Sequence, residues 1–154
     1  MVSSYEELYY YYIALKTKFV SFDAYKNWLN DLFLSDKDID KILLELEWYT
    51  NDEEKTIYEL YVYLYDKLAS LNYHSVVKMV MSELKVKYIN NPDSLRELTD
   101  KLYEIWCLLP EKISYEEPFF TLHIAGEAWS LGDREQVVKN IYWLFNYYDL
   151  NTER

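Results

Sequence analysis

The chain has 154 residues, a net charge of −11 and 51% hydrophobic residues, a composition that excludes a disordered chain and predicts one folded domain over residues 1–154. Two glycines and three prolines are too few for the many turns of an all-β domain or for most nucleotide-binding loops. The excess of carboxylates disfavours direct binding of nucleic acid or of an anionic membrane, because both are negatively charged.

Helical spacing and capping residues predict an all-α domain of roughly eight helices, arranged as a bundle or as a short stack of helical hairpins. In the N-terminal half, the predicted helices run from Ser3 or Ser4 to about Lys16, from Ser21 through Leu34, from Ser35 or Asp36 over Leu46, and from Asn51 or Asp52 over Leu68. The segments Tyr9–Ile13 and Tyr61–Tyr65 are rich in residues that favour strands, but their flanks are helical, so both are predicted as helix.

Two sets of tyrosines in this half are candidate contact residues. Tyr58, Val62 and Tyr65 form a second stripe on the fourth helix, which is either buried on both sides or presented to a partner. Tyr5, Tyr9 and Tyr12 share one side of the first helix and form an exposed patch, unless they pack under a neighbouring helix.

In the C-terminal half, the predicted helices run from about Tyr73 to Asn90, from Asn91-Pro92 to near Pro110, from Phe119 to Leu131, and from Asp133 through about Tyr148. Proline is tolerated at the first helical position, which makes Asn91-Pro92 a helix start. Gly132 is expected to end one helix immediately before Asp133 caps the next. Residues 110–118 are predicted to form the longest loop.

The sequence predicts no metal and no cofactor. Asp36, Asp38, Asp40 and Glu47 match the ligand spacing of a calcium-binding EF-hand loop, but Lys41 stands where the loop needs a glycine. This segment is therefore interpreted as a capped helix start with solvated carboxylates. His123 and Glu127 share a helix face, and without further ligands at suitable spacing they predict a local hydrogen bond or a partly buried histidine.

The single cysteine, Cys107, lies in an apolar setting and is predicted to be buried and inert. One cysteine fits a reducing compartment, the N-terminus lacks the features of a signal peptide, and no apolar run approaches the ~20 residues of a membrane span. A cytoplasmic protein is therefore expected. No catalytic motif is present in the sequence, so an enzyme is not expected.

The strongest functional signal is acidic residues interleaved with aromatic ones. The acidic stretch from residue 36 to residue 59 supplies eight candidate carboxylates: Asp36, Asp38, Asp40, Glu45, Glu47, Asp52, Glu53 and Glu54. Trp48 and Tyr49 are candidate anchors among them, since binding hot spots are typically aromatic residues inside a charged rim. Tyr115, Glu116 and Glu117 form a smaller group of the same kind in the predicted loop. The alternative is a set of ordinary solvated helix faces.

An acidic, helical chain with the sequence Glu45-Leu46-Glu47-Trp48-Tyr49, rich in tyrosine and asparagine and biased toward lysine, resembles the immunity proteins that bacteria make beside their toxins. The resemblance covers general character, and it implies a bacterial or phage source and a cognate basic toxin, often a nuclease, whose working surface the acidic face covers. Two alternatives remain open: a phage-encoded DNA mimic that inhibits a nucleic-acid-binding defence protein, and a helical scaffold module that homodimerises through its tyrosines.

Overall fold

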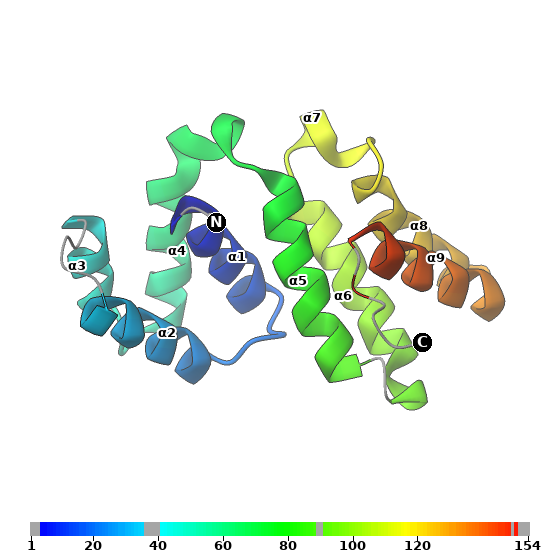
Figure 1. Ribbon diagram of the computed structural model, residues 1–154, viewed down its shortest axis with the longest axis horizontal. Helices are drawn as coiled ribbons and strands as arrows, with labels where there is room; N and C mark the ends of the chain where they lie inside the picture. The colour runs from blue at the N-terminus through cyan, green and yellow to red at the C-terminus, as the bar shows by residue number, and fades with distance from the viewer. Residues whose placement is uncertain (1–3, 36–40, 89–90, 149, 151–154) are drawn as a thin grey trace. The chain divides into compact units, whose positions relative to one another are not determined.

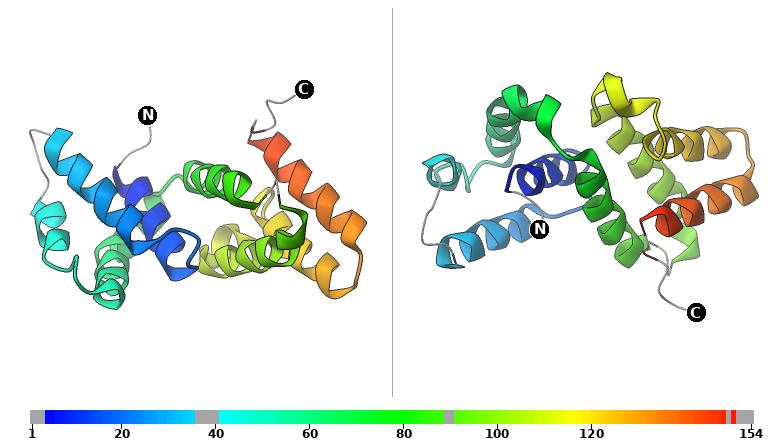
Figure 2. Two further views of the ribbon diagram at one scale, coloured as in Figure 1. Left: turned by 90° about the horizontal axis from the view of Figure 1, so that it is seen from below. Right: turned by 45° about the horizontal axis from the view of Figure 1, so that its top comes forward.

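The computed structural model describes residues 4–35, 41–88, 91–148 and 150 (Figures 1 and 2). These residues form nine α-helices and two 3-10 helices, with no strand among them, which confirms the predicted all-α fold class. The contacts divide the chain into an N-terminal unit, Met1–Val76, and a C-terminal unit, Val77–Arg154. The single domain over residues 1–154 stays a prediction.

The helices of the N-terminal unit are α1 (Ser4–Lys16), α2 (Phe22–Ser35), α3 (Lys41–Glu47), α4 (Glu53–Leu64), the 3-10 helix η1 (Tyr65–Ser70) and the start of α5 (Tyr73–Tyr88). Two predicted caps are confirmed, because the Ser21 hydroxyl accepts from the Ala24 N–H and the Asp52 carboxylate accepts from the Lys55 N–H, both at 3.1 Å. Ser35 instead belongs to the end of α2, where its hydroxyl donates to the Leu32 carbonyl.

Aromatic side chains join α1 to α2 and to α4, which lie beside it in Figure 1. The Tyr11 ring lies 4.5 Å from Trp28 of α2, and the Tyr12 ring lies 5.5 Å from Tyr61 of α4. Tyr9 and Tyr12 are 2% and 7% exposed, so the exposed patch considered for the first helix is wrong and the packed alternative holds. Burial raises the pKa of both hydroxyls, because the interior disfavours phenolate.

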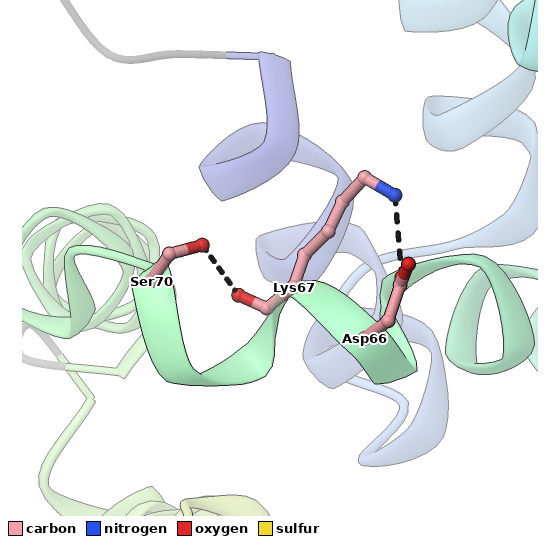
Figure 3. A network of polar contacts seen from close by, with 3 residues as sticks. All are labelled: Asp66, Lys67 and Ser70. Carbon is pink, nitrogen blue, oxygen red and sulfur yellow. Dashed lines mark hydrogen bonds and ion pairs between the residues drawn. The ribbon is translucent and has the colours of Figure 1, made fainter.

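η1 is held to α1 and α4 by a lysine that lies over aromatic rings. The Lys67 ammonium is 4.3 Å from the centre of the Tyr63 ring and 5.4 Å from that of Tyr5. Lys67 also forms an ion pair with Asp66, at 3.3 Å, and its carbonyl accepts a hydrogen bond from the Ser70 hydroxyl (Figure 3). This charge is therefore neutralised within the unit.

The C-terminal unit contains most of α5 and then η2 (Pro92–Ser94), α6 (Leu95–Leu108), α7 (Glu111–Ser114), α8 (Phe119–Ser130) and α9 (Arg134–Tyr147). The Asn91 side chain accepts from the Asp93 N–H, and the Asp133 side chain accepts from the Gln136 N–H, as predicted for these two helix starts. Gly132 has a φ of +76°, the left-handed conformation that ends α8. The predicted loop differs, since α7 forms inside residues 110–118.

Within this unit, α8 packs against both α6 and α9 (Figure 1). Leu102 and Ile105 of α6, Leu122 and Ala125 of α8, and Leu144 of α9 are fully or almost fully buried and contribute to its core. Gly126 of α8 faces α6, where a Cβ atom in its place would lie 3.4 Å from the Cβ of Tyr103. A methyl group at this position would therefore be at the near limit of ordinary van der Waals contact.

Candidate protein-binding surfaces

A hydrogen-bonded turn joins α3 to α4 and carries most of the predicted site. The Thr50 N–H donates to the Glu47 carbonyl at 3.4 Å, and the Asp52 N–H donates to the Tyr49 carbonyl at 2.9 Å. The hydroxyl of the fully buried Thr56 also donates to the Tyr49 carbonyl, at 2.8 Å. These bonds order the backbone under the side chains of residues 47–54, which we call the acidic turn.

Trp48 is the most exposed tryptophan of the chain, with 76% of its surface accessible to solvent. Together with exposed Leu44, half-buried Phe33 and the carboxylate-bearing Glu47, it lines a surface hollow between α2 and α3. A tryptophan left in water exposes a large apolar area that a partner can bury. The acidic turn therefore presents an apolar ring at an acidic edge.

The carboxylates around Trp48 face solvent. Glu47, Asp52, Glu53 and Glu54 are exposed, whereas Glu45 is half-buried. Tyr49 is also half-buried, and the Lys55 ammonium lies 5.4 Å from its ring centre. Residues 44–59 contain six carboxylates and one lysine, a net charge of −5. Asp36, Asp38 and Asp40, which were predicted to extend this surface, lie outside the described residues.

A row of aromatic side chains continues along α4 from the acidic turn. Tyr58 and Tyr65 are 63% and 66% exposed, and Tyr61 and Val62 are exposed beside them. The Tyr61 and Tyr65 rings meet edge to face at 5.9 Å. Of the two alternatives for this helix, burial on both sides is wrong. We call these four residues the tyrosine stripe; presentation to a partner was one of the two predicted alternatives for Tyr58, Val62 and Tyr65, whereas Tyr61 was not predicted to belong to them.

The second predicted group, Tyr115, Glu116 and Glu117, lies in the C-terminal unit, and its residues have different roles. Tyr115 and Glu116 are exposed, and the Tyr115 ring packs edge to face on Trp106 at 5.8 Å. Glu117 is exposed but already engaged, because its carboxylate accepts the Thr121 hydroxyl at 2.5 Å and so helps to hold the first turn of α8. Glu117 therefore has a structural role of its own.

A pocket that was not among the predicted sites lies between α6 and α8, a surface cavity of about 570 Å³. The charged and aromatic residues that line it are Asp100, Tyr103 and Glu104 on α6 and His123, Glu127 and Trp129 on α8. Spacings of three and four residues place Asp100, Tyr103 and Glu104 on one face of α6 and His123 and Glu127 on one face of α8, whereas Trp129 does not follow this spacing. That spacing was visible in the sequence, whereas the pairing of the two faces requires the packed helices.

His123 occupies one wall of this pocket. Its ring stacks on Trp106 at 4.5 Å. Its Nε2 atom lies 3.9 Å from the Glu127 carboxylate, too far for a hydrogen bond, so of the two predicted alternatives the partly buried histidine holds. Among the described residues, no group of three or more histidine, cysteine or acidic side chains is close enough to hold a metal ion. The carboxylates of the α6–α8 pocket are thus spread around the cavity and do not converge on one point.

The prediction that Cys107 is buried is wrong, because its side chain is exposed. The buried face of α6 runs through Leu98, Leu102 and Ile105, and a position two residues after Ile105 lies on the opposite side of the helix. Cys107 is instead near Tyr103, and a hydrogen bond with the thiol raises the pKa of the Tyr103 hydroxyl.

The sequence matches no known protein family, and it matches neither a curated protein nor a solved structure. In the described parts of the chain, every helix is too short or too polar to cross a membrane. The resemblance to immunity proteins therefore rests on the chemistry of the chain itself.

Proposed function

We propose that the protein is an acidic inhibitor of the immunity-protein kind, which binds a basic toxin domain and covers its working surface. The observation that carries this proposal is Trp48, an exposed indole on an ordered turn among exposed carboxylates. Aromatic anchors surrounded by charge are typical of binding hot spots, where truncation of one anchor costs about 2 kcal/mol or more.

The charge of the acidic turn and of the residues that flank it supports a basic partner. A net charge of −5 within residues 44–59 attracts a cationic surface over distances of about a Debye length, ~8 Å at physiological ionic strength. Such steering raises the association rate, whereas the buried aromatic contact slows dissociation. A nuclease groove that binds phosphates is one surface with the complementary charge.

The test is capture of a binding partner with tagged protein from a bacterial source, followed by kinetics with the purified partner at low and high salt. The informative variant is Glu47→Lys with Glu54→Lys, which leaves the α4 cap Asp52 intact. The matched control is Glu83→Lys with Glu135→Lys, two exposed or half-exposed positions of the C-terminal unit with the same change in charge.

We expect a basic toxin whose activity is inhibited by the wild-type protein. The acidic-turn variant should associate about 10-fold more slowly at low salt, and the control much less so. A toxin that binds both variants alike refutes the acidic turn as the binding surface. A captured nucleic-acid-binding defence protein would instead support a DNA mimic.

The tyrosine stripe favours a second candidate function, a homodimeric scaffold module. Tyr58, Tyr61, Val62 and Tyr65 carry no charge, and a two-fold contact would bury the same stripe on both copies. Sedimentation equilibrium of the wild-type protein and of Tyr58→Ser with Tyr65→Ser distinguishes the two. A dimer that the double substitution dissociates supports the scaffold, and a monomeric wild type excludes it.

A further inference from the structure

Three features of the α6–α8 pocket together indicate the kind of ligand that it can bind. Carboxylates stand on both helices, with Asp100 and Glu104 on α6 and Glu127 on α8. Aromatic rings lie beside them, and Gly126 leaves space at the base of the cavity because it has no side chain next to Tyr103. The cavity thus offers acceptor oxygens at its sides and flat apolar faces between them.

Two of these carboxylates make only long contacts with basic side chains of the same chain. Glu104 is 3.9 Å from the Lys101 ammonium, and Glu127 is 3.9 Å from His123. Both distances exceed the 2.7–2.9 Å of a strong charge-assisted hydrogen bond, and a carboxylate has about four acceptor positions. The side chains of Glu104 and Glu127 are also about half exposed, so an incoming donor can reach them.

One aromatic ring that lines the pocket already contacts a guanidinium of the same chain. The guanidinium of Arg134 lies over the Trp129 ring, with its central carbon 5.1 Å from the ring centre. Tyr103, on the opposite helix, is exposed. A guanidinium is planar, stacks on aromatic rings and donates in several directions at once. Carboxylates spread around a cavity suit such a group better than they suit a compact ammonium or a metal ion.

We propose that the α6–α8 pocket binds an arginine side chain of a basic polypeptide. The identity of that polypeptide rests on the proposed function, in which it is the inhibited toxin. The pocket proposal adds two points to the proposed function. The recognised chemical group is a guanidinium, and recognition involves the C-terminal unit as well as the acidic turn.

The probe is an acetylated and amidated peptide of alternating glycine and arginine, with a glycine–lysine peptide of equal length as the comparison. Binding to the full chain is followed by NMR through the indole N–H signal of Trp129, which Trp129→Phe identifies. The test variant is Glu104→Gln with Glu127→Gln, which keeps the shape of both side chains. Glu83→Gln with Glu135→Gln is the control, and far-UV circular dichroism verifies the fold of each.

We expect the arginine peptide to shift the Trp129 signal and to bind more tightly than the lysine peptide. The pocket variant should lose about 10-fold in affinity, since each charge-assisted hydrogen bond is replaced by a neutral one, while the control is unchanged. An unmoved Trp129 signal, or equal affinity of all variants, overturns the proposal.

The arginine-binding pocket and the proposed inhibitor function can be refuted independently of each other. Peptide binding at the pocket without any toxin partner would refute the inhibitor and leave the arginine site standing. A toxin that binds through the acidic turn, together with a peptide that leaves Trp129 unmoved, would refute the pocket alone.

Discussion

The two glycines of the chain provide a sharp test of the C-terminal unit, because alanine should have opposite effects at the two positions. Gly132 has a φ of +76°, and a Cβ atom there would meet nothing within 4 Å. The effect of Gly132→Ala is therefore confined to the backbone, where the left-handed conformation costs about 1–2 kcal/mol for an L-residue. We expect the free energy of unfolding to fall by about 1 kcal/mol.

Gly126 lies inside α8, and its Cβ position is 3.4 Å from the Tyr103 Cβ, at the near limit of ordinary van der Waals contact. Alanine favours a helix interior over glycine by about 0.8–1 kcal/mol. Because the added methyl group fits, Gly126→Ala should raise the free energy of unfolding by about 0.5–1 kcal/mol. The two variants should therefore differ by roughly 2 kcal/mol.

The assay is urea unfolding followed by far-UV circular dichroism, with the midpoints compared at unchanged slope. A Gly132→Ala variant as stable as the wild type would contradict the left-handed end of α8. A Gly126→Ala variant destabilised by more than about 1 kcal/mol would show that α6 and α8 approach more closely than described, since such losses come from overpacking.

Two further predictions concern aromatic residues. Trp48→Ala should change the free energy of unfolding by no more than about 0.5 kcal/mol, because the side chain is exposed, yet it should speed dissociation of the captured toxin; chemical unfolding and surface plasmon resonance test the two parts, and an unfolded variant contradicts the first. Burial raises the pKa of Tyr73 from 10.0 to about 12. The folded state therefore favours neutral Tyr73, and its contribution to stability is present below pH 10.0 and lost as the pH rises toward about 12. Thermal melts across this range should fall in midpoint, and Tyr73→Phe should fall less; equal falls would contradict the assignment.

Local signals in the sequence predicted several helix starts, but not the end of α4, which changes to a 3-10 helix at Tyr65 although the helix was predicted over Leu68. The caps at Ser21, Asp52, Asn91 and Asp133 each depend on a side chain that bonds its own following turn, and Gly132 depends on its own φ. None of them needs a distant partner. The same locality explains why the all-α class followed from spacing and from the scarcity of turn residues.

Burial of tyrosine could not be predicted in this way. A tyrosine ring suits both a core and an exposed surface, so the choice depends on what packs over it. Tyr9 and Tyr12 are covered by side chains far along the chain, Tyr73 and Tyr61, whereas Tyr58 and Tyr65 are left uncovered. The α6–α8 pocket has the same origin, because its two faces become one site only when the helices pack.

The exposed position of Cys107 has a practical consequence for any measurement of assembly. A lone thiol at the surface can be oxidised to an intermolecular disulfide, which yields a covalent pair of chains in air-exposed samples. Such a pair would be joined through α6 and would mimic a dimer formed by the tyrosine stripe of α4. The same thiol accepts one maleimide dye without mutagenesis, four residues from Tyr103, so a fluorophore there would stand next to the cavity where arginine is expected to enter.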